Sequence, residues 1–269
     1  MRILHFISSA IIFFGLSSSA LGQATPSDAQ GIFERARSAY LAKDYETAKR
    51  ELGLAVSART DWPEAILLEG LIAWQEGKLT AAIKSAKDAI RLQPVFPVAH
   101  YSLAQMFFDQ GKANDAFKEV SLALTQGEQS ANTYVLLGDI ELFRHKTKEV
   151  ISAYEKALQQ PAPNQEVTPE LKMRLEGLRN TAEITRRLGE PGFERPQRLN
   201  PSTNSPSSSF ELGCLLNEQG RFVNVIVISS AQEIGGKEKL LEMVSQYKFS
   251  PAKKDGKPVP FWFYLSVNR

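Results

Sequence analysis

The residues able to carry out chemistry are few and scattered along this chain of 269 residues. Cys214 is the only cysteine, so neither an intramolecular disulfide nor a cysteine-based zinc or CxxC redox site can form. His5, His100 and His145 lie far apart, with no second ligand at metal-binding spacing. Nucleophile elbow, P-loop, GxGxxG and HExxH motifs are missing. The sequence therefore predicts no catalytic residue, no metal and no cofactor, and favours a protein that is not an enzyme.

A different chemistry, apolar recognition, is indicated by large side chains that recur at fixed spacing. Tyr40, Trp74, Phe108 and Leu142 follow one another at intervals of 34 residues. An apolar column of this kind suits the apolar side chains of a bound protein or peptide. The same spacing also fits residues that pack between neighbouring helices, so the sequence leaves both interpretations open.

The column belongs to a 34-residue repeat that occupies residues 29–62, 63–96, 97–130 and 131–164. Block positions 8, 20 and 27 hold alanine or glycine in eleven of twelve cases. These residues are Ala36, Gly70, Ala104 and Gly138; Ala48, Ala82, Ala116 and the exception Val150; and Ala55, Ala89, Ala123 and Ala157. Small side chains at helical spacing let two helices approach closely, so each block is predicted to be a helix pair. Gly77 and Gly111 end the first helix of blocks two and three, and Lys43 and His145 hold that position in the outer blocks.

This pattern resembles the tetratricopeptide repeat family over residues 29–164. The resemblance implies a solenoid of helix pairs whose first helices form a concave surface that binds proteins or peptides. Residues 169–188 follow as a further amphipathic helix, which we expect to cap the last repeat. The predicted helical domain therefore covers residues 29–188, with Tyr40, Trp74, Phe108 and Leu142 as its candidate groove residues.

Residues 189–208 are predicted to be a linker. Prolines recur every five residues among serine, asparagine and glycine, at Pro191, Pro196, Pro201 and Pro206. A segment of this composition buries too little apolar surface to fold, so we expect a semi-extended spacer.

Residues 209–269 change to an alternating apolar pattern that predicts a small α+β domain. Strands are expected at 210–216, 222–228 and 259–267, and a short helix at 240–247. The predicted order is β-β-α-β. The predicted fold class is therefore multidomain, an all-α solenoid of four helix pairs and a capping helix followed by a small α+β domain.

The segment YKFSPAKKDGKPV, residues 247–259, resembles the signature of TonB C-terminal domains. An aromatic residue precedes Pro-Ala, and Gly-x-Pro-Val leads into the last strand. The resemblance implies the periplasm of a Gram-negative bacterium. It also implies strand addition, in which an extended peptide pairs with the edge of the three-stranded sheet.

Trp262 and Tyr264 are the candidate partner-binding residues at this sheet edge. They alternate with Phe261 and Phe263, so they lie on the opposite face of the last strand. Partial exposure near the edge and simple coverage of the outer face of the sheet both fit the pattern. An exposed edge strand would also permit a homodimer by strand exchange.

Residues 1–24 are predicted to be a cleavable secretory signal. Arg2 precedes an apolar stretch that runs to Leu16, and small residues follow up to the candidate cleavage positions after Ala20 and Ala24. The apolar stretch covers about 14 residues, fewer than the roughly 18–20 that span a bilayer. We therefore expect a periplasmic protein, with an inner-membrane anchor by an uncleaved N-terminus as the alternative.

Charge narrows the range of partners. The chain has 32 basic and 30 acidic residues, and a net charge of +2 argues against nucleic acid. Lys253, Lys254 and Lys257 form a basic turn that is either solvated or bound to an anionic cell-wall polymer. The sequence thus predicts an exported adaptor that binds one protein through its repeats and another through its terminal strand. The alternatives are an accessory component of TonB-dependent transport, paired with an outer-membrane receptor, and a cell-wall-associated structural protein.

Overall fold

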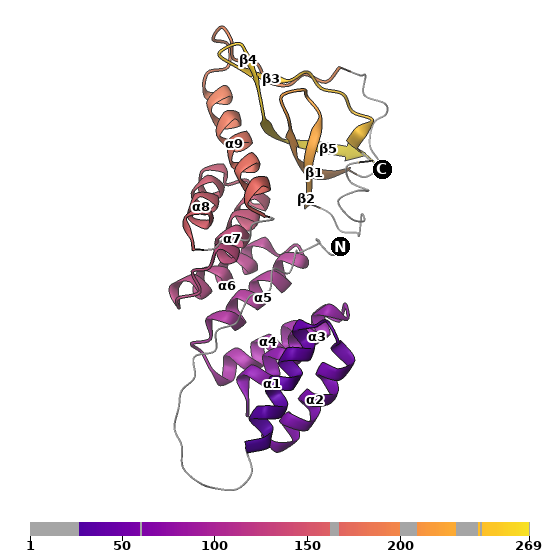
Figure 1. Cartoon of the computed structure of the whole chain (residues 1–269). Coiled ribbons are helices and arrows are strands. Elements are labelled where there is room, and N and C mark those ends of the chain that lie inside the picture. Colours follow the sequence, from indigo (N-terminus) through magenta and orange to yellow (C-terminus); the bar gives the residue numbers. More distant parts are fainter. Residues whose placement is uncertain are drawn as a thin grey trace. The chain divides into compact units, whose positions relative to one another are not determined.

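The computed structural model describes residues 27–59, 61–161, 167–199, 209–229, 242 and 244–268. The chain, drawn as a ribbon in Figure 1, consists of two compact units, and each is described by itself. The N-terminal unit holds the described residues up to Glu128, and the C-terminal unit holds those from Gln129 onward. The predicted signal segment, residues 1–24, lies outside the described residues.

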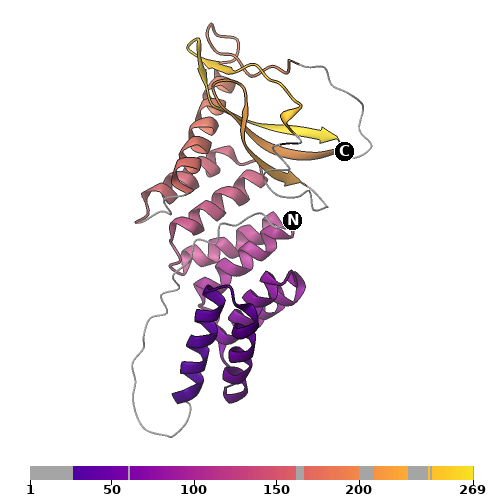
Figure 2. The ribbon, with the colours of Figure 1, turned by 45° about the vertical axis from the view of Figure 1, so that its right-hand side comes forward.

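Three helix pairs make up the described part of the N-terminal unit (Figures 1 and 2). They are α1 (Ser27–Leu41) with α2 (Tyr45–Ala58), α3 (Pro63–Gln75) with α4 (Leu79–Leu92), and α5 (Pro97–Asp109) with α6 (Ala113–Thr125). The small residues predicted at the helix contacts are buried throughout; Ala36, Ala48 and Ala55 are completely inaccessible. The prediction of 34-residue helix pairs is confirmed.

One left-handed residue ends the first helix of each pair. Gly77 and Gly111 have φ of 80° and 73°, and Lys43 and His145 adopt the same region at 63° and 58°. Glycine enters this region freely, whereas a residue with a Cβ pays a steric penalty on the order of 1 kcal/mol. The first and fourth helix pairs therefore make the same turn without glycine, and their backbone is strained at Lys43 and His145.

The C-terminal unit joins a fourth helix pair to a sheet. Its helices are α7 (Ala131–Phe143), α8 (Thr147–Gln159) and α9 (Val167–Arg186), where α9 is the predicted capping helix. Its strands are β1 (Ser209–Leu216), β2 (Phe222–Ser229), β3 (Ala252–Lys254), β4 (Lys257–Val259) and β5 (Phe261–Asn268). β1, β2 and β5 form an antiparallel sheet in the order β2-β1-β5, and β3 and β4 form a separate hairpin.

The predicted third strand, residues 259–267, is divided at Pro260. Before it, β4 pairs with β3 through a two-residue turn in which Asp255 and Gly256 have φ of 50° and 74°. Both central residues are left-handed, as the tight hairpin turn between twisted strands requires. After Pro260, β5 pairs with β1. Within the predicted helix at 240–247, residues 240, 241 and 243 lie outside the described residues, whereas residues 242, 244 and 245 are helical. Val244 is buried with Leu212 on one face of the sheet.

The opposite face of the sheet packs on the helices of the C-terminal unit. One core contains residues from α7, α8, α9, β1 and β5. Its fully or nearly fully buried members are Leu142, Val150, Tyr154, Ala157, Leu171, Leu175, Leu178, Leu215 and Trp262. The fourth repeat and the sheet are therefore one folded body and not two tethered domains.

The segment 189–199 differs from the predicted spacer because it is bonded to the sheet region. Glu194 and Lys253 exchange two backbone hydrogen bonds of 3.0 and 2.8 Å, and the Ser250 amide donates to the Gln197 carbonyl oxygen at 2.8 Å. Phe193 is buried beside Ile184 of α9. The segment buries too little apolar surface to fold alone, but here its backbone is held by hydrogen bonds to residues 50 to 60 positions further along the chain. Residues 200–208 lie outside the described residues.

Candidate partner-binding surfaces

The first helices of the N-terminal unit form a row in which α3 contacts both α1 and α5. Tyr40, Trp74 and Phe108 of the predicted column lie on these three helices, and all three are half-buried. Burial raises the pKa of Tyr40 to about 12, and its ring centroid lies 5.8 Å from that of Tyr45. The three side chains thus pack against neighbours and retain accessible surface.

Side-chain hydrogen bonds cross from one repeat to the next at the end of the first helices. The Trp74 indole nitrogen donates to Asp109 Oδ2 at 2.9 Å, and the Tyr45 hydroxyl donates to Gln75 Oε1 at 3.5 Å. Each bond joins residues about one repeat apart, so neighbouring repeats are tied together beside the column, and in one case through the column residue Trp74 itself. Sequence reasoning named Trp74 and missed Asp109 and Gln75, although both stand one residue after a column position.

The fourth member of the predicted column, Leu142, is not available to a partner. Its side chain is completely buried in the core shared with the sheet, and its carbonyl oxygen accepts a hydrogen bond of 3.3 Å from the Tyr264 hydroxyl. The groove prediction is wrong at this position. The spacing of the repeat identifies Leu142 as equivalent to Trp74, but it contains no information about the sheet that covers it.

The row of first helices has few positive charges. α3 and α5 contain no lysine or arginine, whereas α4 contains three such residues and α6 contains one. The arginines of α1 are paired, Arg37 with Glu34 at 3.0 Å and Arg35 with Glu51 at 3.1 Å. Glu64 and Asp109 are half-buried on α3 and α5. This surface is therefore apolar with a weakly acidic character.

The predicted sheet-edge residues lie on β5, which is an edge strand. Trp262 is only 1% exposed, so the prediction of partial exposure is wrong for this residue. Tyr264 is half-buried, its ring centroid 4.5 Å from that of His145, and burial beside Glu211 raises its pKa to about 12. Both residues lie on the face of the sheet that packs against the fourth helix pair and α9.

Two adjacent polar side chains of α9 contact the backbone of β5 at its outer edge. Thr181 Oγ1 accepts a hydrogen bond from the Trp262 amide at 2.8 Å and lies 2.7 Å from the Trp262 carbonyl oxygen. Asn180 Nδ2 donates to the Pro260 carbonyl oxygen at 3.0 Å. Nothing in the helical pattern of α9 indicates these contacts.

The basic turn is largely neutralised within the chain. Lys253 Nζ lies 3.1 Å from a carboxylate oxygen of Glu194, and Lys254 Nζ lies 2.6 Å from one of Glu183. Lys257 is exposed. Two of the three charges that would attract an anionic polymer are therefore already paired, which weakens the argument for cell-wall binding.

A polar network joins α7, α8, α9 and β2. The Tyr154 hydroxyl donates to Asp139 at 2.6 Å, and Arg174 lies 3.4 Å from Asp139 and 2.7 Å from Glu170. Asn224 of β2 donates to Glu170 at 2.5 Å. Burial raises the pKa of the Tyr154 hydroxyl. Burial alone would lower the pKa of Arg174, but its neighbours Tyr154, Asp139 and Glu170 outweigh this effect and raise it. The network fixes the sheet against the fourth repeat.

Two further chemistry-bearing residues, His100 and Cys214, lie in the interior of the chain. His100 is buried, with Nδ1 2.7 Å from Glu119 Oε2. Cys214 is buried, which raises its thiol pKa. In the described part of the chain, no group of three or more histidine, cysteine or acidic residues could hold a metal ion. No helix among those residues is both long and apolar enough to cross a membrane.

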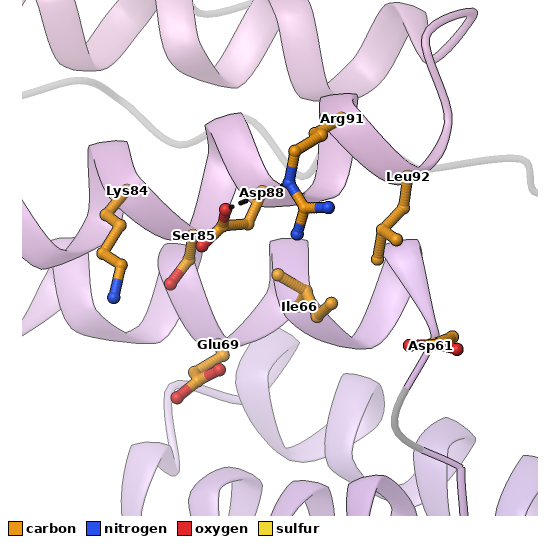
Figure 3. A pocket seen from close by; sticks show the side chains of 8 residues that line it. All are labelled: Asp61, Ile66, Glu69, Lys84, Ser85, Asp88, Arg91 and Leu92. Atoms are coloured by element: carbon orange, nitrogen blue, oxygen red, sulfur yellow. Dashed lines mark ion pairs between the residues drawn. The ribbon is translucent and has the colours of Figure 1, made fainter.

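A hollow of about 400 Å³ lies between α3 and α4 (Figure 3). Arg91 and Asp88 form an ion pair of 3.6 Å within it. Its lining consists of Asp61, Ile66, Glu69, Lys84, Ser85, Asp88, Arg91 and Leu92. Charges of both signs nearly cancel, and Asp61, Lys84 and Arg91 are exposed, so the hollow has the character of a solvated surface.

The geometry defines the N-terminal unit as part of a helix-pair solenoid, and the comparisons agree. Residues 67–131 match the family model described as tetratricopeptide repeat. Proteins with these repeats mediate protein–protein interactions. No curated protein matches the sequence.

Several solved structures are similar to parts of this chain at low sequence identity. The MamA protein is 20% identical, with a TM-score of 0.47, over 61% of this chain and 85% of its own. The Cut9–Hcn1 hetero-tetramer of the APC/C matches at 14% identity and a TM-score of 0.50, over 55% of this chain and 30% of that one. The first TPR of Spaghetti (RPAP3), bound to the HSP90 peptide SRMEEVD, is 24% identical, with a TM-score of 0.39, over 41% of this chain and 87% of its own.

Proposed function

We propose that this protein is an exported, non-enzymatic adaptor of the periplasm that binds a partner protein on α1, α3 and α5. The observation that carries the proposal is the half-buried column Tyr40, Trp74 and Phe108, fixed in part by the bond between Trp74 and Asp109. Aromatic side chains already held in place lose little conformational entropy when they bind and supply large contact areas. The interaction role of tetratricopeptide repeats supports the same conclusion.

The partner segment on this surface is apolar and not acidic. α3 and α5 offer no cation, and the arginines of α1 are already paired. A peptide rich in carboxylates, such as the SRMEEVD bound by one structural relative, would leave its charges unpaired near Glu64 and Asp109. This peptide is therefore a suitable negative probe.

Site-specific crosslinking in the native organism tests the adaptor proposal. A photoreactive phenylalanine analogue replaces Phe108 on α5 and, as the matched control, Leu122, which is 43% exposed on α6. We expect discrete adducts from position 108 only, and fewer of them after Trp74→Ala. Equal adduct patterns from both positions would show that the first helices are not the binding surface.

The periplasmic location rests on the order of charged, apolar and small residues in 1–24. N-terminal sequencing of the protein from fractionated cells tests it. A mature start at Leu21 or Thr25 in the periplasmic fraction supports export with cleavage. An intact Met1 in the membrane fraction supports the anchored alternative.

A second candidate is an accessory role in TonB-dependent transport. The observation in its favour is the order β2-β1-β5, which leaves the last strand at an edge, as strand addition to a receptor segment requires. Ser266→Pro tests this role, because Ser266 directs its amide outward from β5 and proline is tolerated there without loss of a ladder bond. We expect the Ser266→Pro variant to capture less outer-membrane receptor than the wild-type chain in an affinity pull-down. Undiminished capture would rule out pairing along β5.

A further inference from the structure

The outer edge of β5 is divided into two halves with different surroundings. Successive residues of an antiparallel strand direct their backbone N–H and C=O groups alternately toward one neighbour and the other. Both groups of Trp262 face α9 and not β1, because both contact Thr181. Tyr264 and Ser266 follow at two-residue steps and share this outward direction.

Side chains of α9 satisfy the first half of this edge as a neighbouring strand would. The Thr181 hydroxyl accepts from the Trp262 amide, and its proton is shared between the carbonyl oxygens of Trp262, at 2.7 Å, and Gly177, at 2.8 Å. Asn180, itself only 6% exposed, donates to the Pro260 carbonyl oxygen. The outward backbone groups of residues 260–262 are therefore already bonded.

Several contacts fasten α9 at this position. A Cβ atom on Gly177 would lie 2.3 Å from Leu215 Cδ1, so the helix approaches β1 as closely as a glycine allows. Further along, Glu183 pairs with Lys254 at 2.6 Å, and Ile184 is completely buried. The placement of Asn180 and Thr181 against β5 is thus fixed from both sides.

The second half of the edge is open and chemically suited to self-association. Among the described residues, no hydrogen bond reaches the outward backbone groups of Tyr264 or Ser266, and Ser266 is exposed. β5 reads FWFYLSVN, eight uncharged residues of which five, the four aromatic residues and the valine, are of types enriched in strands. Uncharged edge strands of this type are templates for pairing with another copy.

We propose that Asn180 and Thr181 form an edge guard that prevents a second copy of this chain from pairing along β5. The guard occupies residues 260–262, so an incoming strand finds only the short run from Tyr264 to Asn268. Departure of α9 from the sheet opens the whole strand and permits a strand-paired dimer. The inference rests on the α9–β5 geometry and is independent of the adaptor proposal.

Native-state hydrogen exchange of the full chain, read residue by residue by NMR, tests the guard without any substitution. We expect the Trp262 amide to exchange more slowly than those of Tyr264 and Ser266 by at least about fivefold, the factor that one hydrogen bond supplies. Equal protection of the three amides would overturn the proposal, because the edge would then be uniformly covered or uniformly open.

Substitutions test the consequence for assembly. Thr181→Val keeps the shape and removes the hydroxyl, and Asn180→Leu removes the bond to Pro260. Thr181→Ser restores a hydroxyl, and Thr185→Val makes the same change at an exposed position one turn further along α9. By sedimentation velocity we expect the T181V/N180L chain to dimerise, and the wild type, T181S and T185V chains to stay monomeric. A monomeric double variant, or a wild-type dimer paired through β5, would overturn the proposal.

Discussion

Gly177→Ala adds one methyl group where α9 comes closest to the sheet. The new Cβ would lie 2.3 Å from Leu215 Cδ1 and 3.5 Å from the Trp262 amide nitrogen. Carbon atoms in contact prefer about 3.5–4.0 Å, so α9 or Leu215 must move by more than about 1 Å. Leu215 is completely buried and Trp262 nearly so, which leaves no free volume for a simple rotation of the leucine.

Two effects of opposite sign determine the free-energy change. Overpacking of a well-filled core costs about 1–3 kcal/mol. Replacement of glycine by alanine inside a helix gains about 1 kcal/mol. The matched control is Gly53→Ala in α2, where an added Cβ meets nothing within 4 Å. Gly53→Ala should therefore stabilise by about 1 kcal/mol. The difference between the two variants isolates the overpacking, about 1–3 kcal/mol.

Hydrogen exchange of the full chain, read by mass spectrometry, reports the two units separately. We expect faster exchange in peptides from α9 and β5 of the Gly177→Ala chain, and slower exchange in α2 peptides of the Gly53→Ala chain. Slower exchange throughout α9 in the Gly177→Ala chain would refute the close packing of α9 on the sheet. Unchanged exchange rates in peptides from α1–α6 of the Gly177→Ala chain are the internal control.

Three further predictions concern a turn, the thiol and acid stability. Lys43→Gly should increase the free energy of unfolding by up to about 1 kcal/mol, because φ at Lys43 is 63° and glycine adopts this region without strain. Lys112→Gly should bring no such gain, because φ at Lys112 is −87°. Equal changes in the unfolding midpoints of the two variants would contradict the strain argument. Cys214 should react with iodoacetamide only at the rate of unfolding, because burial raises its pKa and lowers the thiolate fraction; rapid alkylation of the folded chain would contradict this. Hydrogen bonds from Thr47 and Lys254 lower the folded-state pKa of the carboxyl groups of Asp44 and Glu183, respectively. These two carboxylates therefore stabilise the folded state fully above the ordinary carboxyl pKa, and this stabilisation is lost as the pH falls through the lowered pKa values. Urea midpoints that rise between pH 5 and pH 3 would contradict this sign.

The repeats were predictable because their determinants are local and periodic. Each Ala or Gly at block positions 8, 20 and 27 marks a helix contact within 34 residues, and Ala82, Ala116 and Ala157 are all completely buried. The turn at Asp255 and Gly256 is equally local, because two left-handed residues are specified by their own types.

The state of the candidate site residues depends on pairing between distant segments, which periodicity does not contain. Leu142 and Tyr264 meet across 122 positions, and Thr181 and Trp262 across 81. The local sequence around Leu142 and around Trp262 is compatible with an accessible apolar side chain. Each is buried because the segment that contains the other packs against it. The alternation of β5 showed correctly which residues share a face, but not that the fourth repeat occupies that face.

The core shared by α8, α9 and β5 also limits how the repeat number can change during evolution. A 34-residue block inserted after α8 would separate Tyr154 and Ala157 from Leu171, Leu175 and Trp262, which complete their packing. The new block would present a different surface to the sheet, and the network centred on Arg174 would lose Asp139. Duplication or loss of repeats is therefore expected upstream of α7, and related chains of different length should differ there while the segment from α7 to β5 keeps its length.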